Sequence, residues 1–126
     1  MYLIISLFVT DPFVKVSLLQ HGKALKTRKT SIKKNTIDPV FNESINFNVT
    51  PDMLESISLV VTVWDYNSKS RDDFVGRIVL GKQATGAYEV THWNRMMQCH
   101  RSPVAQWHTL RPRDDGDASS SSLSIS

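Results

Sequence analysis

The stretch Ile57-Ser-Leu-Val-Val-Thr-Val-Trp64 decides the fold class of this chain. Its side chains are mostly β-branched, aliphatic or aromatic, and such side chains fit the pleated surface of a sheet. Two sets alternate along it with the two-residue period of a strand, namely Leu59, Val61 and Val63 against Val60, Thr62 and Trp64. The stretch is therefore predicted to be a strand with one buried face.

Several shorter segments on both sides of this strand show the same character. We expect further strands at residues 13–19, 26–32, 41–49, 74–80 and 105–110. Between Gly86 and Pro103 the apolar spacing changes, and Val90, Trp93 and Met97 predict one face of a short helix. Short strands without βα alternation indicate an antiparallel sandwich. The pattern predicts an all-β, antiparallel β-sandwich with one short helix before the last strand.

The composition indicates one folded domain without covalent staples. A chain of 126 residues, with 40% hydrophobic and 21% charged residues, can bury a core of ordinary size. Cys99 is the only cysteine, which excludes an internal disulfide and favours a reducing, cytoplasmic compartment. Residues 2–9 are apolar, but a membrane helix needs about 20 such residues, so we expect a strand there.

Charge is distributed unevenly along the chain. The formal net charge is only +3, yet residues 12–37 contain seven lysines and arginines and no acidic residue. The chain beyond Arg111 instead carries Asp114, Asp115, Asp117 and a serine run, with few apolar residues. Such a composition is typical of disorder, so residues 112–126 are predicted to form a disordered tail.

Seven segments together resemble the second C2 domain (C2B) of synaptotagmins. In order they are Asp11-Pro-Phe-Val-Lys-Val16, Lys29-Thr-Ser-Ile-Lys-Lys-Asn-Thr36, Pro39-Val-Phe-Asn-Glu-Ser44, Val63-Trp-Asp-Tyr66, Asp73-Phe-Val-Gly76, His92-Trp93 and Pro103-Val-Ala-Gln-Trp-His-Thr-Leu110. The variations are most similar to the B/K-like synaptotagmins, which are regarded as calcium-independent. The resemblance implies a C2 β-sandwich over residues 11–111.

The N-terminus departs from the family pattern. A C2B domain has a first strand, most of a second strand and a loop ahead of the segment that matches Asp11, whereas only residues 1–10 precede Asp11 here. This divergent apolar segment suggests an N-terminally truncated or alternatively started domain, incomplete at that end. We expect residues 2–9 to supply one strand in place of a lost one; otherwise a sheet edge would lie open.

The resemblance implies a calcium site, but a degenerate one. Calcium prefers six to eight oxygen ligands, and affinity depends on ligand charge. The matching positions hold Asp11, Asp65, Asn67 and Asp73, and the fifth lies in the missing segment. We expect a weak or inactive site and no cofactor, although Asp72 could shift into the site and support weak residual binding.

The basic stretch is the main candidate binding site, formed by Lys26, Arg28, Lys29, Lys33 and Lys34. On a strand, Lys26 and Arg28 share one face and Lys29 lies on the other. Each basic residue near an anionic bilayer contributes about 1 kcal/mol, and the family uses this strand to bind acidic lipid. No aromatic residues interleave with these bases, which argues against nucleic acid. Phosphatidylserine and phosphoinositide membranes are therefore the predicted partners.

Protein partners give the alternative interpretation. The resemblance implies contacts with SNARE proteins or other synaptotagmins through Arg101, Trp107 and His108, although packing beside the helix also explains the tryptophan. No nucleophile elbow, phosphate loop or activated carboxylate pair is present, so no enzyme is predicted. We expect a module for vesicle trafficking and exocytosis, cytoplasmic and peripheral on a vesicle or the plasma membrane. The alternative is an adaptor that binds SNAREs or self-associates.

Overall fold

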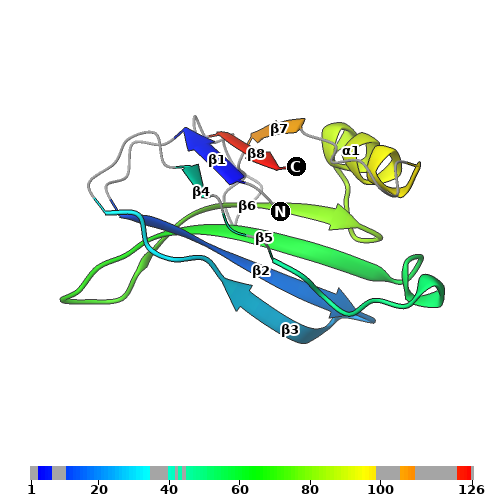
Figure 1. Ribbon diagram of the computed structural model, residues 1–126, viewed down its shortest axis with the longest axis horizontal. Helices are drawn as coiled ribbons and strands as arrows, with labels where there is room; N and C mark the ends of the chain where they lie inside the picture. Colours follow the sequence, from blue (N-terminus) through cyan, green and yellow to red (C-terminus); the bar gives the residue numbers. More distant parts are fainter. Residues whose placement is uncertain are drawn as a thin grey trace.

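Two four-stranded antiparallel sheets face each other, with one α-helix beside them (Figure 1). The computed structural model describes residues 3–6, 11–34, 40–41, 43, 45–98, 106–109 and 122–125. The larger sheet has the order β3-β2-β5-β6, from β3 (Lys23–Lys29), β2 (Pro12–Gln20), β5 (Ile57–Asp65) and β6 (Asp73–Gly81). The smaller sheet has the order β4-β1-β8-β7, from β4 (Val40–Phe41), β1 (Leu3–Ser6), β8 (Ser122–Ile125) and β7 (Gln106–Thr109). This architecture confirms the predicted antiparallel sandwich.

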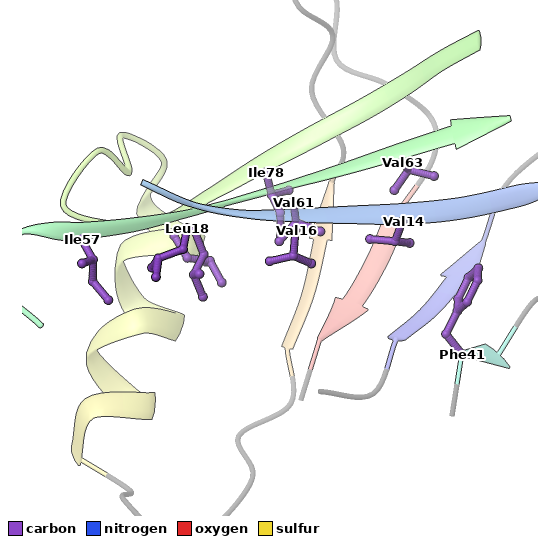
Figure 2. Packing of buried hydrophobic residues seen from close by; sticks show 10 residues of the cluster. Val14, Val16, Leu18, Phe41, Ile57, Val61, Val63 and Ile78 are labelled. Carbon is purple, nitrogen blue, oxygen red and sulfur yellow. The ribbon is translucent and has the colours of Figure 1, made fainter. Parts of the chain in front are cut away.

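The core lies between the two sheets. Burial alternates along most of β2 and β5, because alternate side chains of a strand point to the same face. Figure 2 shows these side chains pointing from the larger sheet toward the smaller one, with Phe41 approaching from β4. The buried cluster is Val14, Val16, Leu18, Phe41, Ile57, Leu59, Val61, Val63, Ile78 and Leu80. The alternation predicted for Leu59, Val61 and Val63 is confirmed.

A tight turn sets the register of β2 and β3. His21 and Gly22 have φ values of 53° and 78°, and positive φ at both central residues is typical of the type I′ hairpin turn. The turn pairs Gln20 with Lys23, so β3 begins at Lys23 and ends at Lys29. The strand expected at residues 26–32 was therefore placed three residues too far along the chain, because pairing starts directly at the turn.

The smaller sheet joins the two ends of the described chain. β1 pairs with β4 on one side and with β8 on the other, which confirms the strand expected within residues 2–9. β8 also pairs with β7, so the prediction of a disordered tail was wrong for Ser122–Ile125. The polar composition was misleading here because β8 gains backbone hydrogen-bond partners from β1, at the other end of the chain, and from β7. The helix precedes β7, the strand expected near residues 105–110. Because β8 follows β7, the helix does not come directly before the last strand, contrary to the prediction.

The prediction for residues 41–49 also needs correction. The strand expected at residues 41–49 is limited to Val40–Phe41. Ile45, Phe47 and Val49 do pack against the core, but residues 45–50 form no regular ladder, because alternation reports burial and not a hydrogen-bonded neighbour. A short 3-10 helix, η1 (Pro51–Met53), follows.

The helix α1 (Ala87–Gln98) buries a face that differs from the predicted one. Glu89 and His92 are its buried residues, whereas Val90 is 41% exposed and Trp93 is half-buried against the core. A hydrophobic pattern could not identify this face, because two of the side chains that form it are polar. None of the helices in the described part of the chain is long and apolar enough to span a bilayer.

Candidate lipid-binding surface

The strand β3 forms an outer border of the larger sheet and carries most of the basic stretch (Figure 1). All seven of its residues are exposed, although β2 beside it is largely buried. We call β3 and the segment that continues to residue 34 the basic edge. It contains Lys23, Lys26, Arg28, Lys29, Lys33 and Lys34 and no acidic residue. An edge strand with charged side chains resists pairing with other strands while remaining accessible to a partner.

The register divides the cations of β3 between two faces. Lys26 is opposite Leu18 and Arg28 is opposite Val16, and cross-strand partners share a face, so both bases lie on the core side. Lys29 is opposite Lys15 and therefore lies on the outer face. The guanidinium Nε of Arg28 donates a hydrogen bond to the carbonyl oxygen of Asn46 at 3.0 Å, which holds Arg28 along the border of the sandwich.

On the outer face, Lys15 extends the basic edge toward an aromatic group. Its Nζ lies 4.4 Å from the ring centroid of Trp64 and 5.9 Å from that of Phe13, close enough for cation–π attraction. Trp64 contacts Phe74 edge to face at 5.4 Å and donates its indole N–H to Thr62 Oγ1 at 2.9 Å. Sequence reasoning did not include Lys15 in the site. The signal was its two-residue alternation with buried Val14 and Val16, which places it on the outer face.

Lys33 and Lys34 reach different surroundings. The backbone N–H of Lys33 donates to Pro12 O at 3.0 Å, and its Nζ lies 5.8 Å from the ring centroid of Phe41. Lys34 is exposed, with its Nζ 5.9 Å from the ring centroid of Tyr66. The five predicted lipid-binding residues therefore follow one border of the sheet and do not form one flat patch.

A carboxylate holds the segment that follows β3. Both oxygens of Glu43 accept from the backbone N–H of Ser31, at 3.0 and 3.2 Å, and Oε2 also accepts from the Ser31 hydroxyl at 2.8 Å. Thr30 points the other way: its buried hydroxyl accepts from Val14 N–H at 2.9 Å and donates to Ser31 O at 3.0 Å. These contacts fix the direction of the basic edge as it leaves the sheet.

Most of the residues expected at the calcium site lie in and beside the connection between β5 and β6: Asp65 ends β5, Asn67 and Asp72 lie in the connection, and Asp73 begins β6. Asp65 Oδ1 accepts from the backbone N–H of Asp11 at 3.1 Å. Asn67 Oδ1 accepts from Lys69 N–H, and Asp72 Oδ1 accepts from Asn67 N–H, each at 3.0 Å. Asp73 is opposite Asp65 in the register of the two strands. Most of these side chains therefore have a hydrogen-bonding role within the fold.

A sequence model of the C2 domain family matches residues 6–109. The protein belongs to the C2 domain family. Over 110 residues, 87% of this chain, the C2 domain is 44% identical to Synaptotagmin-A of Diplobatis ommata and 43% identical to Synaptotagmin-2 of Homo sapiens. The chain spans about a quarter of the length of these relatives, since the match covers 26% of each.

Solved structures agree on the fold of this C2 domain. A C2 domain of plant Extended Synaptotagmin 1 matches with a TM-score of 0.63 at 18% identity, over 98% of this chain and 91% of that one. BON1-C2B matches with a TM-score of 0.58 at 18% identity, over 97% of this chain and 83% of that one. At such low identity these matches establish the fold alone.

The residues expected at a calcium site have other contacts in the described part of this C2 domain. Calcium needs several oxygens that converge on one point. Across the described ranges, no group of three or more His, Cys, Asp or Glu side chains is close enough to hold a metal ion. The oxygens of Asp65, Asn67 and Asp72 instead accept from nearby backbone N–H groups. The weak or inactive calcium site stays a prediction.

The structure describes the predicted partner-binding residues of this C2 domain only in part. Arg101 is not described. Trp107 and His108 belong to β7, where their backbones pair with Ser124 and Leu123, but their side chains are not described. Their role in protein binding stays a prediction.

Proposed function

We propose that this C2 domain is a non-catalytic module that binds anionic phospholipid membranes through its basic edge, without calcium, in vesicle trafficking. One observation supports the proposal most directly. Every residue of β3 is exposed, and the run of bases that starts in this strand contains no acidic residue. C2 domains and synaptotagmins are generally binding modules and not enzymes.

The magnitude of the electrostatic attraction is sufficient for membrane binding. Lys26, Arg28, Lys29 and Lys34 are exposed, and each base close to an anionic bilayer contributes about 1 kcal/mol. Four such residues supply about 4 kcal/mol, which corresponds to roughly a thousandfold increase in affinity over a neutral surface.

We infer that the bilayer contacts the border of the larger sheet and not its broad outer face. Lys26 and Arg28 lie on one side of β3 and Lys29 on the other, so only an approach along the border brings all three near the lipid. Lys15, packed against Trp64, would then contribute less than the bases of β3.

The loop between β5 and β6 supports a mode of binding that is limited to the surface. Residues 67–71 are exposed and contain no large apolar side chain, so this loop has little to insert into the acyl region. The carboxylate contacts described above argue against calcium as a bridge to the lipid. We therefore propose peripheral association with the cytoplasmic face of a vesicle or the plasma membrane.

Cosedimentation with vesicles tests this proposal. Vesicles of phosphatidylcholine, with or without phosphatidylserine and a phosphoinositide, should be compared in a calcium chelator and in calcium. We expect binding only to the anionic vesicles, at equal strength in both buffers. Raising the salt from about 0.1 M to 1 M shortens the Debye length from about 10 Å to about 3 Å and should abolish most of the binding. Equal binding to neutral vesicles would contradict the proposal and favour a protein partner.

A further inference from the structure

Ser31 stands within the basic edge in a sequence that is rich in positive charge. Arg28 and Lys29 precede it by three and two positions, and Lys33 and Lys34 follow it by two and three. Protein kinases select substrates partly by charge, and a peptide groove lined with carboxylates favours serines with bases at such positions. The local sequence therefore offers a recognition site for a basophilic kinase.

The fold distinguishes Ser31 from its neighbour Thr30. Thr30 is only 8% exposed, and its hydroxyl bonds to Val14 N–H and to Ser31 O, so a kinase could reach it only after the strand pairing opens. Ser31 is exposed and follows β3, the border strand, in a segment without regular structure. Its hydroxyl makes one side-chain contact in the described structure, the hydrogen bond to Glu43 at 2.8 Å.

We propose that Ser31 is a phosphorylation site and that its modification switches off lipid binding by the basic edge. A basophilic kinase would transfer the γ-phosphoryl group of ATP to Ser31 Oγ, which forms the Oγ–P bond and breaks the bond to ADP. The hydroxyl proton leaves through the catalytic base of the kinase. The second part of the proposal rests on the function proposed above.

Charge explains the expected effect. A phosphoserine carries about −1.5 to −2 charges at neutral pH. The basic edge from residue 23 to 34 holds six bases, so the phosphate would cancel about a third of its charge at a point between Lys29 and Lys33. The phosphate would also displace the carboxylate of Glu43, because like charges at hydrogen-bonding distance repel. Modification should therefore lower both the surface charge and the local order.

Site mapping tests the first part. The folded chain and a peptide of residues 25–37 should be incubated with ATP and the catalytic subunit of cAMP-dependent protein kinase, followed by mass spectrometry. We expect one phosphate on Ser31 in both, none on Thr30, no product at this position from Ser31→Ala, and at least a tenfold slower reaction with Arg28→Ala. Phosphorylation of the peptide but not of the folded chain would refute the accessibility of Ser31. Failure of both would refute the recognition sequence.

Vesicle binding tests the second part. Phosphorylated chain should bind vesicles with phosphatidylserine and phosphoinositide about 30-fold more weakly than unmodified chain, which corresponds to about 2 kcal/mol. Ser31→Glu, with one charge, should weaken binding about fivefold. The matched control Ser68→Glu, in the exposed β5–β6 loop, should change it less than twofold. Glu43→Gln removes the carboxylate without adding negative charge and should not weaken binding.

The outcomes separate this proposal from the proposed function. If unmodified chain fails to bind anionic vesicles, the lipid-binding function is refuted, and the mapped phosphate on Ser31 stands by itself. If unmodified and phosphorylated chains bind equally, the lipid-binding function stands and the switch is refuted.

Discussion

The two outer strands of the larger sheet, β3 and β6, are built in opposite ways. β6 buries Gly76, Ile78 and Leu80 on its core face and contacts α1. β3 exposes all of its residues and carries four bases between Lys23 and Lys29. Charge on β3 discourages two sheets from joining edge to edge. The buried face of β6 serves stability, and the charged strand β3 remains accessible to a ligand.

The largest effect on the free energy of unfolding should come from a buried residue of β6. Leu80 in β6 is fully buried, and leucine to alanine changes in cores cost about 2–5 kcal/mol. Leu25 in β3 is 51% exposed. We expect Leu80→Ala to lower the free energy of unfolding by about 3 kcal/mol and the matched Leu25→Ala to lower it by less than about 0.5 kcal/mol, as measured by urea denaturation. Similar losses in both variants would show that β3 is also covered.

Lipid binding should depend on the exposed residues of β3. Replacing Lys26, Arg28 and Lys29 by alanine should weaken binding to anionic vesicles on the order of a hundredfold, or about 3 kcal/mol, with unfolding free energy unchanged within about 0.5 kcal/mol. The control Lys69→Ala/Arg71→Ala alters the β5–β6 loop instead and should cost only a few-fold. Equal losses in the two variants would assign binding to net charge and not to β3.

Two glycines extend the comparison to the backbone. Gly22, at the turn into β3, has φ +78° and open space where a Cβ would lie. Gly81, at the end of β6, has φ +92°, and a Cβ there would meet Ile57 O at 2.5 Å. Left-handed backbone alone costs alanine about 1–2 kcal/mol. We expect about 1 kcal/mol for Gly22→Ala and about 2–3 kcal/mol for Gly81→Ala in thermal or urea unfolding. A larger loss of stability for Gly22→Ala than for Gly81→Ala would contradict this prediction.

Calcium should have the smallest effect. A site of micromolar affinity would stabilise the native state by about 4 kcal/mol at a thousandfold excess of calcium. Because Asp65, Asn67 and Asp72 already accept backbone hydrogen bonds, we expect millimolar calcium to change the melting temperature by less than about 2 °C, as measured by calorimetry. A rise of more than about 10 °C would show that the loop rearranges into a calcium site.

Sequence reasoning succeeded where burial alternates along a strand and failed where distant segments decide. The alternation of Val14 and Val16 with Lys15 is a local signal, and so is that of residues 57–64. The strand at Ser122–Ile125 depends on β1 and β7, which local composition does not reveal. The same holds for the candidate site. The bases of β3 can be read from the sequence, but only the fold brings the carboxylate of Glu43 to Ser31 and the ring of Trp64 to Lys15.

The pairing of β1 with β8 has a consequence for synthesis on the ribosome. β2, β3, β5 and β6 are all complete by Gly81, so the larger sheet can form while the rest of the chain is still being added. The smaller sheet cannot be completed at that point, because β1 can pair with β4 but its other neighbour, which is also the partner of β7, is Ser122–Ile125 and emerges later. Closing so long a loop is slow, and partly assembled chains with exposed apolar surface are prone to aggregate. During synthesis, the core face of the larger sheet is therefore exposed until the smaller sheet is complete. A chaperone would be most useful at this stage.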